Sequence, residues 1–166
     1  MLWHGTRVTN VYSILMNGLM LPRGNRFNLM FGNGIYFANV PSKSANYCDP
    51  EKGSKNYLLL CEVFVGKQLD VYESDTTVDK QILKAKKDSV YAHGKWTPRE
   101  TLTIHNNSVY KGGLEEIDHK TDLLYDEFIV FREDQFKIRY IVEIDLKKKS
   151  VRQEAAPTTS RPRRNQ

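Results

Sequence analysis

The feature that most limits the fold of this chain is an apolar run near its middle, from Tyr57 to Val65. β-Branched and aromatic residues contribute to the run, and Gly53 and Gly66 bound it on the two sides. A short apolar run between turn residues is typical of a strand that is buried on both faces. The sequence therefore predicts a strand in the interior of a sheet-containing domain.

Other segments also have strand patterns. Phe128 to Phe131 is uniformly apolar, which predicts a strand in the core. From Ile138 to Leu146 apolar residues alternate with charged ones, and only Ile141 breaks the pattern. This alternation predicts a strand with one buried face. Shorter strands are predicted at 2–5, 35–38 and 102–104, with a turn at Asn106-Asn107.

Two short helices are predicted in the first third of the chain, at 6–17 and 41–47. The first has the i, i+3, i+4, i+7 spacing of an amphipathic helix, a threonine cap and a glycine at its end. The stretch 22–34 has turn composition, and 68–95 is polar and weakly patterned, so neither predicts an element. The fold class expected is α+β, rich in strands. In the first predicted helix the apolar stripe consists of Val8, Val11, Tyr12 and Leu15. Thr6 or Thr9 would cap its start, and Gly18 would end it.

The chain has 166 residues, which fits one domain, and a net charge of +5. Residues 147–166 contain seven basic residues and one acid, so the rest of the chain is close to neutral. A near-neutral domain offers no electrostatic reason for its own surface to bind nucleic acid. We expect one folded domain at 1–146 and a basic, disordered tail at 147–166.

Cysteine content and hydropathy exclude several classes of protein. Cys48 and Cys61 are the only cysteines, and their spacing matches neither a disulfide framework nor a zinc site. No apolar run approaches the roughly 18 residues of a membrane helix, and no secretory leader is visible. A reducing compartment, the cytosol or the nucleus, is favoured.

Three predicted strands carry one polar or aromatic residue each: His4, Tyr36 and Glu127. Each alone is better explained as an ordinary core or surface residue than as a functional one. Together, three strands can hold one elongated ligand through an imidazole, a ring face and a charge. The segment around Tyr36 is glycine-rich but lacks the GxGxxG spacing of a dinucleotide fold. No serine or cysteine nucleophile motif is present.

The residues of these segments and their order along the chain resemble the catalytic domain of the poly(ADP-ribose) polymerases, most closely the DNA-dependent members. The resemblance extends, with gaps, from Leu2 to about Leu146. It implies the ADP-ribosyltransferase fold of split antiparallel sheets with short helices, here without its N-terminal part. The segments that carry it are 2–7 (LWHGTR), 30–38 (MFGNGIYFA), 42–48 (SKSANYC) and 124–130 (LYDEFIV), with a looser match from Asp88 to Pro98.

The resemblance implies an enzyme that cleaves NAD⁺, its substrate, and transfers ADP-ribose without a metal. In the family pattern Glu127 bonds the nicotinamide ribose and polarises the acceptor, with Lys43 nearby. His4, Tyr36 and Glu127 would be the catalytic set. The remaining cofactor-binding positions would be Thr6 and Asn10 beside His4 at the adenosine ribose, Gly5 and Ser44 at the carboxamide, Tyr47 and Tyr36 on the two faces of the nicotinamide, and Phe37 and Ala38.

A glutamate at position 127 is the family pattern for members that elongate chains, so poly-ADP-ribosylation is expected. The partners implied are acceptor proteins and growing ADP-ribose chains, with DNA contacted only through domains that this chain lacks, and no membrane. A nuclear protein of DNA repair is implied, with the cytoplasm as the alternative. Mono-ADP-ribosylation and an inactive, truncated module that binds NAD⁺ or ADP-ribose remain alternatives.

The chain departs from the family pattern at two positions. Leu29 stands where the most similar members have a tyrosine, in the loop over the nicotinamide site. Met20 stands where they have an arginine, and Arg23 is a candidate replacement. These positions concern loop closure and adenine binding.

Overall fold

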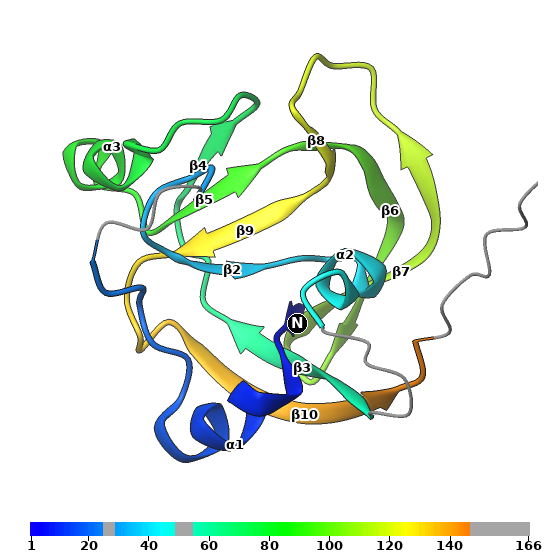
Figure 1. Ribbon diagram of the computed structural model, residues 1–166. Helices are drawn as coiled ribbons and strands as arrows, with labels where there is room; N and C mark the ends of the chain where they lie inside the picture. Colours follow the sequence, from blue (N-terminus) through cyan, green and yellow to red (C-terminus); the bar gives the residue numbers. More distant parts are fainter. Residues whose placement is uncertain (25–28, 49–54, 147–166) are drawn as a thin grey trace, which may run out of the picture.

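The computed structural model describes residues 1–24, 29–48 and 55–146. Within these residues the strands form three sheets, which Figure 1 shows together with three helices. The α+β class is confirmed; the predicted tail at 147–166 lies outside the described residues. The strands are β1 (Leu2–Gly5), β2 (Ile35–Phe37), β3 (Asn56–Val63), β4 (Gln68–Val71), β5 (Ser89–Ala92), β6 (Gly94–Ile104), β7 (Asn107–Glu116), β8 (Leu123–Tyr125), β9 (Glu127–Val130) and β10 (Phe136–Ile144), and the helices are α1 (Val8–Asn17), α2 (Pro41–Ala45) and α3 (Val78–Ala85).

The first sheet has the order β1-β3-β10, with β3 antiparallel to both neighbours. The consecutive residues Leu58 and Leu59 are both buried. Since successive side chains point to opposite faces of a strand, β3 is covered on both sides at this point, as its apolar run predicted.

The second sheet, β2-β9-β5-β4, lies between two clusters of apolar side chains. Phe128 and Val130 of β9 belong to the cluster that also contains Leu2 and Leu59 of the first sheet. Ile129, between them in sequence, belongs to the cluster on the α3 side. All four residues of β9 are buried, so the predicted core strand is confirmed.

A short bridge between β1 and the end of β2 joins the first two sheets. The N–H of Trp3 donates to the carbonyl of Ala38 (2.8 Å), and the N–H of Ala38 donates to the carbonyl of Trp3 (2.9 Å). These bonds place His4, the next residue of β1, beside β2. Most strand pairs are antiparallel, as expected, whereas β4–β5 and β6–β8 are parallel.

Helix α1 differs from its prediction in its cap and its buried face. It begins at Val8, after Arg7 at the N-cap, and no side chain caps it. None of its residues is buried, and Tyr12 is 75% exposed. The partly buried Ile14, which lies outside the predicted stripe, packs against the core instead. Gly18 ends the helix with the positive φ of +79° that was expected, but its ψ of 175° is not that of the expected left-handed helical conformation.

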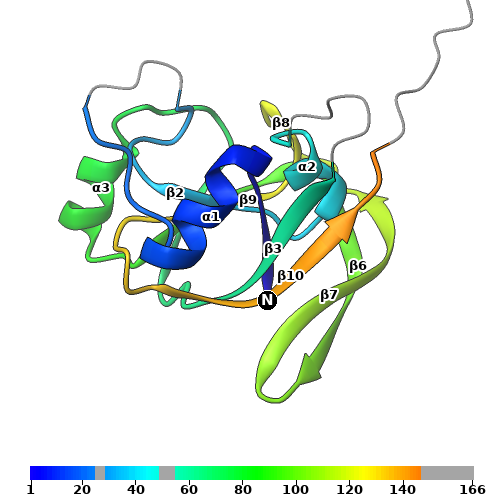
Figure 2. The same cartoon turned by 60° about the horizontal axis from the view of Figure 1, so that its bottom comes forward.

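The weakly patterned stretch 68–95 contains β4, α3, β5 and the start of β6, which the sequence did not predict. The strand predicted at 102–104 is the end of the much longer β6. Strands β6 and β7 form a hairpin that extends away from the other sheets (Figure 2). Its turn lies one residue earlier than expected, at His105 and Asn106, both with positive φ.

Strand β10 begins two residues earlier than predicted and carries an irregularity in its pairing with β3. Ile138 lies opposite Cys61, and Tyr140 lies opposite the adjacent Leu60, so Arg139 is an extra residue. A bulge of this kind shifts the residues that follow it. Tyr140, expected on the buried face, is therefore 63% exposed.

None of the helices in the described part of the chain reaches the length and apolar character needed to cross a bilayer.

Candidate active site

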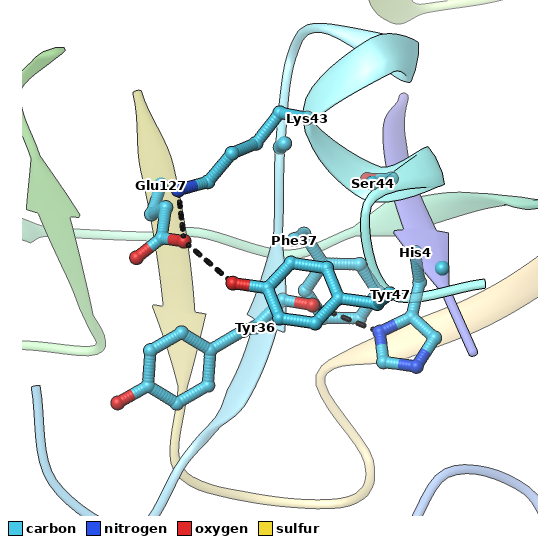
Figure 3. Close-up of a pocket in the computed structure, with 9 residues that line it drawn as sticks. His4, Tyr36, Phe37, Lys43, Ser44, Tyr47 and Glu127 are labelled. Atoms are coloured by element: carbon cyan, nitrogen blue, oxygen red, sulfur yellow. Dashed lines mark hydrogen bonds and ion pairs between the residues drawn. The ribbon is translucent and has the colours of Figure 1, made fainter. Parts of the chain in front are cut away.

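A pocket lies where β1, β2, β9 and the α2 segment meet, and Figure 3 shows its lining. The three residues expected to converge, His4, Tyr36 and Glu127, all line it although they are far apart in the sequence. Nine of the described residues form the lining: His4, Gly5, Tyr36, Phe37, Ala38, Lys43, Ser44, Tyr47 and Glu127.

His4 is held in a defined orientation by the neighbouring strand. Its Nδ1 lies 2.9 Å from the backbone carbonyl of Tyr36. A carbonyl only accepts hydrogen bonds, so Nδ1 carries the proton, and Nε2 keeps a lone pair when the ring is neutral. Burial lowers the pKa of His4, and the bond to Tyr36 opposes this only in part. The ring therefore offers an acceptor suited to a hydroxyl group.

The hydroxyl of Tyr36 fixes the loop that precedes β2. It donates to the carbonyl of Gly32 (2.9 Å) and accepts from the N–H of Phe31 (2.9 Å). Burial is the main cause that raises the pKa of Tyr36, so the phenol stays protonated. The loop therefore uses the only proton of the hydroxyl and one of its two lone pairs.

Glu127 begins β9 and is buried, so its charge needs a partner close by. Lys43 of α2, expected near Glu127, provides it, with Nζ 2.9 Å from Oε1. The hydroxyl of Tyr47 donates to the same oxygen over a longer distance of 3.4 Å. Figure 3 shows both groups directed at one carboxylate. Burial and the charge of Glu127 together raise the pKa of Tyr47 to about 12, which keeps it a donor.

Gly5 and Ser44 bring β1 and α2 into direct contact. A Cβ built on Gly5 would lie 1.7 Å from the carbonyl oxygen of Ser44, so no side chain fits there. The hydroxyl of Ser44 donates to the carbonyl of Trp3 (3.0 Å), and its lone pairs remain available. The backbone of α2 fills the space that a side chain at position 5 would need. Packing alone therefore explains why this residue is glycine, and no bound ligand is needed for the explanation.

Thr6 and Asn10, expected beside His4, are not among the lining residues. They bond to each other instead, with Asn10 Nδ2 donating to Thr6 Oγ1 at 3.1 Å. The two departures from the family pattern, Leu29 and Met20, are also outside the lining, as is Arg23.

Sequence reasoning missed a buried carboxylate next to the pocket. Asp126, directly before Glu127, accepts hydrogen bonds from β5, β6 and the segment before α2. The one local signal is a second acid at the start of an apolar strand, and its partners are up to 87 residues away. Among the described residues, no group of three or more His, Cys, Asp and Glu side chains is placed to hold a metal ion.

Comparisons with known proteins give matches over most of the chain. Residues 1–146 match the family model of the poly(ADP-ribose) polymerase catalytic domain. The chain is similar to poly [ADP-ribose] polymerase 2 of Caenorhabditis elegans, with 57% identity over 144 residues that cover 87% of this chain and 27% of that protein. It is also similar to poly [ADP-ribose] polymerase 2 of Arabidopsis thaliana (39% over 151 residues, 87% and 23%) and to poly [ADP-ribose] polymerase of Drosophila melanogaster (36% over 154 residues, 89% and 15%).

The chain thus spans about a quarter or less of the length of these relatives. The match covers both the apolar strands and the segments that line the pocket. This chain belongs to the poly(ADP-ribose) polymerase catalytic-domain family.

Proposed function

We propose that this chain transfers ADP-ribose from NAD⁺ to protein side chains and to growing ADP-ribose chains. The observation that supports this most is the shared pocket of His4, Tyr36, Tyr47 and Glu127, with Lys43 against the acid. The pocket offers a hydroxyl acceptor, two aromatic rings and a charge, which suits the ribose and nicotinamide groups of NAD⁺. The names of the relatives support the same activity.

For this reaction the protein needs mainly to position the substrate and to stabilise the charge that develops on it. The bond between the ribose C1′ and the nicotinamide nitrogen breaks, and nicotinamide leaves as a neutral molecule with the bonding electron pair. Positive charge develops on the ribose, and the carboxylate of Glu127 stabilises it. An acceptor oxygen then bonds to C1′ and loses its proton to Glu127 or to water.

The roles of the other residues follow from their partners. His4 Nε2 accepts from a ribose hydroxyl, and the rings of Tyr36 and Tyr47 contact the nicotinamide. Gly5 and Ser44 hold the carboxamide of the nicotinamide, and Phe37 and Ala38 line the same pocket. In the free enzyme Lys43 neutralises Glu127 and keeps it directed into the pocket. A substrate with positive charge on its nicotinamide ring then replaces part of that contact.

The test uses the 166-residue chain with NAD⁺ labelled in its adenosine part. Nicotinamide release measures cleavage, and denaturing gels separate single units from ladders. We expect Glu127→Ala to lower elongation about 100-fold or more, because it removes the charge opposite the developing cation. Binding of NAD⁺, followed by calorimetry, should change little, since the rings and His4 remain.

Glu115→Ala is the matched control, because Glu115 is an exposed glutamate of the β6–β7 hairpin. It should leave both readouts unchanged. Equal chain lengths from Glu127→Ala and the parent would refute the role of Glu127. Single units from the parent would favour mono-ADP-ribosylation, and binding without nicotinamide release would favour an inactive module.

We also propose a nuclear location and acceptor proteins as partners, on the strength of the family alone. Imaging of a tagged chain tests the location, and a cytoplasmic signal would contradict it.

A further inference from the structure

A second carboxylate next to the pocket is buried more completely than Glu127. Asp126 is 1% exposed, against 4% for Glu127. Its oxygens accept hydrogen bonds from donors in three separate parts of the chain. Oδ1 accepts from the N–H of Gly94 (2.8 Å), and Oδ2 accepts from Asn39 Nδ2 (2.7 Å), from the hydroxyl of Thr97 (2.6 Å) and from the hydroxyl of Tyr91 (3.1 Å).

All four groups can donate, and a carboxylate has enough lone pairs on its two oxygens to accept from each of them. Asn39 turns its amide nitrogen to Asp126, and its own buried Oδ1 has no partner among the described residues. A buried group left without a partner costs stability. The bond to Asp126 is therefore kept at the expense of another contact.

The network joins the two chain segments that carry the Lys43–Glu127 pair. Asp126 precedes Glu127 by one residue, and Asn39 precedes Lys43 by four. The bond between Asp126 and Asn39 therefore ties the start of β9 to the segment that leads into α2.

The bonds to β5 and β6 hold the other side of the same junction. Gly94 lies so close to the chain before β9 that an added Cβ would be 2.5 Å from the Cα of Tyr125 and 2.6 Å from the N of Asp126. Tyr91, on β5, also stacks on the ring of Phe128, with centroids 4.7 Å apart. The backbone at Asp126 is thus held from several directions, and it carries Glu127 directly.

We propose that Asp126 is a positioning residue: it sets the distance and direction between Glu127 and Lys43 without touching the substrate. The role in turnover rests on the proposed function, whereas the effect on the Lys43–Glu127 contact does not. Asp126 binds through both oxygens, so the exchange to asparagine is a sharp test. Whichever way the new amide is turned, its NH₂ group faces at least one donor of the network.

We expect Asp126→Asn to lower kcat for nicotinamide release about tenfold, which corresponds to about 1.4 kcal/mol in the barrier. The KM for NAD⁺ should stay within about threefold of the parent, because the binding surfaces of the pocket do not include Asp126. Asp122→Asn is the matched control. Asp122 is an exposed acid four residues earlier that accepts from the N–H of Ser74, and its exchange should change neither constant.

A second readout needs no activity. The side chain of Lys43 is 17% exposed and paired, so an amine-reactive reagent should label it slowly, and labelled peptides can be quantified by mass spectrometry. Asp126→Asn should speed labelling of Lys43 severalfold. Lys111, paired with Glu100 on the distant hairpin, serves as the internal control and should not change.

If Asp126→Asn does not fold, Thr97→Val removes one donor at nearly constant volume and should move both readouts in the same direction by a smaller factor. If the parent releases no nicotinamide, the proposed function fails, and labelling of Lys43 alone decides the inference. A folded variant that is less stable but keeps the parent's kcat and Lys43 labelling rate would overturn the proposal, since Asp126 would then be purely structural.

Discussion

His4 and Glu127 both line the pocket, but one is a neutral ring and the other is an acid paired with a lysine. Burial lowers the pKa of His4, so the imidazole is neutral near pH 7 and presents a lone pair. Glu127 is buried as well, but Lys43 lies 2.9 Å away and compensates its charge. A neutral acceptor and an acid in one pocket suit a substrate whose ribose binds by its hydroxyls and becomes cationic during the reaction.

The lowered pKa of His4 predicts a pH effect on stability. As the pH falls below the unfolded-state pKa, near 6.5, the unfolded chain takes up a proton that folded His4 resists, so the free energy of unfolding falls. His4→Asn keeps a donor for the carbonyl of Tyr36 but cannot titrate. We expect urea denaturation to show a smaller loss of stability between pH 7.5 and 5.5 for His4→Asn than for the parent.

His105→Asn, at the exposed hairpin turn, is the control for this experiment and should follow the parent. The same pH dependence in the parent and in His4→Asn would contradict the assignment of His4 as a partly buried, neutral group.

At the scale of elements, the pocket depends on how closely α2 approaches β1. Helix α2 is only five residues long, so it has few internal hydrogen bonds to stabilise it. Its contact with β1 therefore holds it in place. Ser44 donates to the backbone of β1, and Gly5 leaves the space that the backbone of α2 occupies. Lys43 and Tyr47 reach Glu127 only because α2 is held there.

Gly5→Ala should therefore destabilise the protein and displace α2. The added Cβ would meet a backbone oxygen, which cannot rotate away, so we expect a loss of about 1–3 kcal/mol in the free energy of unfolding. Gly113→Ala is the matched control, because nothing lies within 4 Å of a Cβ there, and it should change stability by less than about 0.5 kcal/mol. Equal unfolding curves for the two variants would show that α2 can shift freely.

At the scale of the whole molecule, the second sheet is the centre, and α1 and the β6–β7 hairpin lie outside it. Apolar clusters cover both faces of that sheet, and Val90 and Ile129 have no exposed surface. Helix α1 buries no residue, and the hairpin projects from the sheets (Figure 2). The pocket is lined by β2 and β9 of this sheet, together with β1 of the first sheet and the α2 segment.

This arrangement predicts unequal local stability. Backbone amides of β5 and β9 should exchange with solvent deuterium only on global unfolding, because their strands are buried. Amides of α1 should exchange through local opening at least about 100-fold faster, since little burial opposes it. Hydrogen exchange followed by mass spectrometry measures both, and equal protection of α1 and β9 would contradict this view.

The sequence predicted best where burial is complete. Strand β9 is buried throughout, and β3 is buried on both faces at Leu58 and Leu59, so apolar runs in the sequence reveal both strands. Strands β4 and β7 have few or no buried residues, and their polar sequences carry no such pattern. The amphipathic stripe of α1 pointed to the wrong face, because which stripe packs on the core depends on where the helix lies.

For the site, the order of the motifs along the chain indicates His4, Tyr36, Lys43 and Glu127. The network of Asp126 could not be predicted in this way, because its donors come from distant segments and include a backbone N–H that no side chain reveals. Likewise, the sequence shows a glycine at position 5, but the reason that no side chain fits there, the nearby backbone of α2, is seen only in the structure.

Local patterns therefore established the α+β class, the interior strands and the family whose residues line the pocket. The partner of each polar group, the bulge in β10 and the exposed position of α1 came from the packed chain alone. The physical reason is range. Apolar periodicity and residue type act within a few neighbours along the chain, whereas a hydrogen bond to Asp126 or a contact with Gly5 joins residues that only folding brings together.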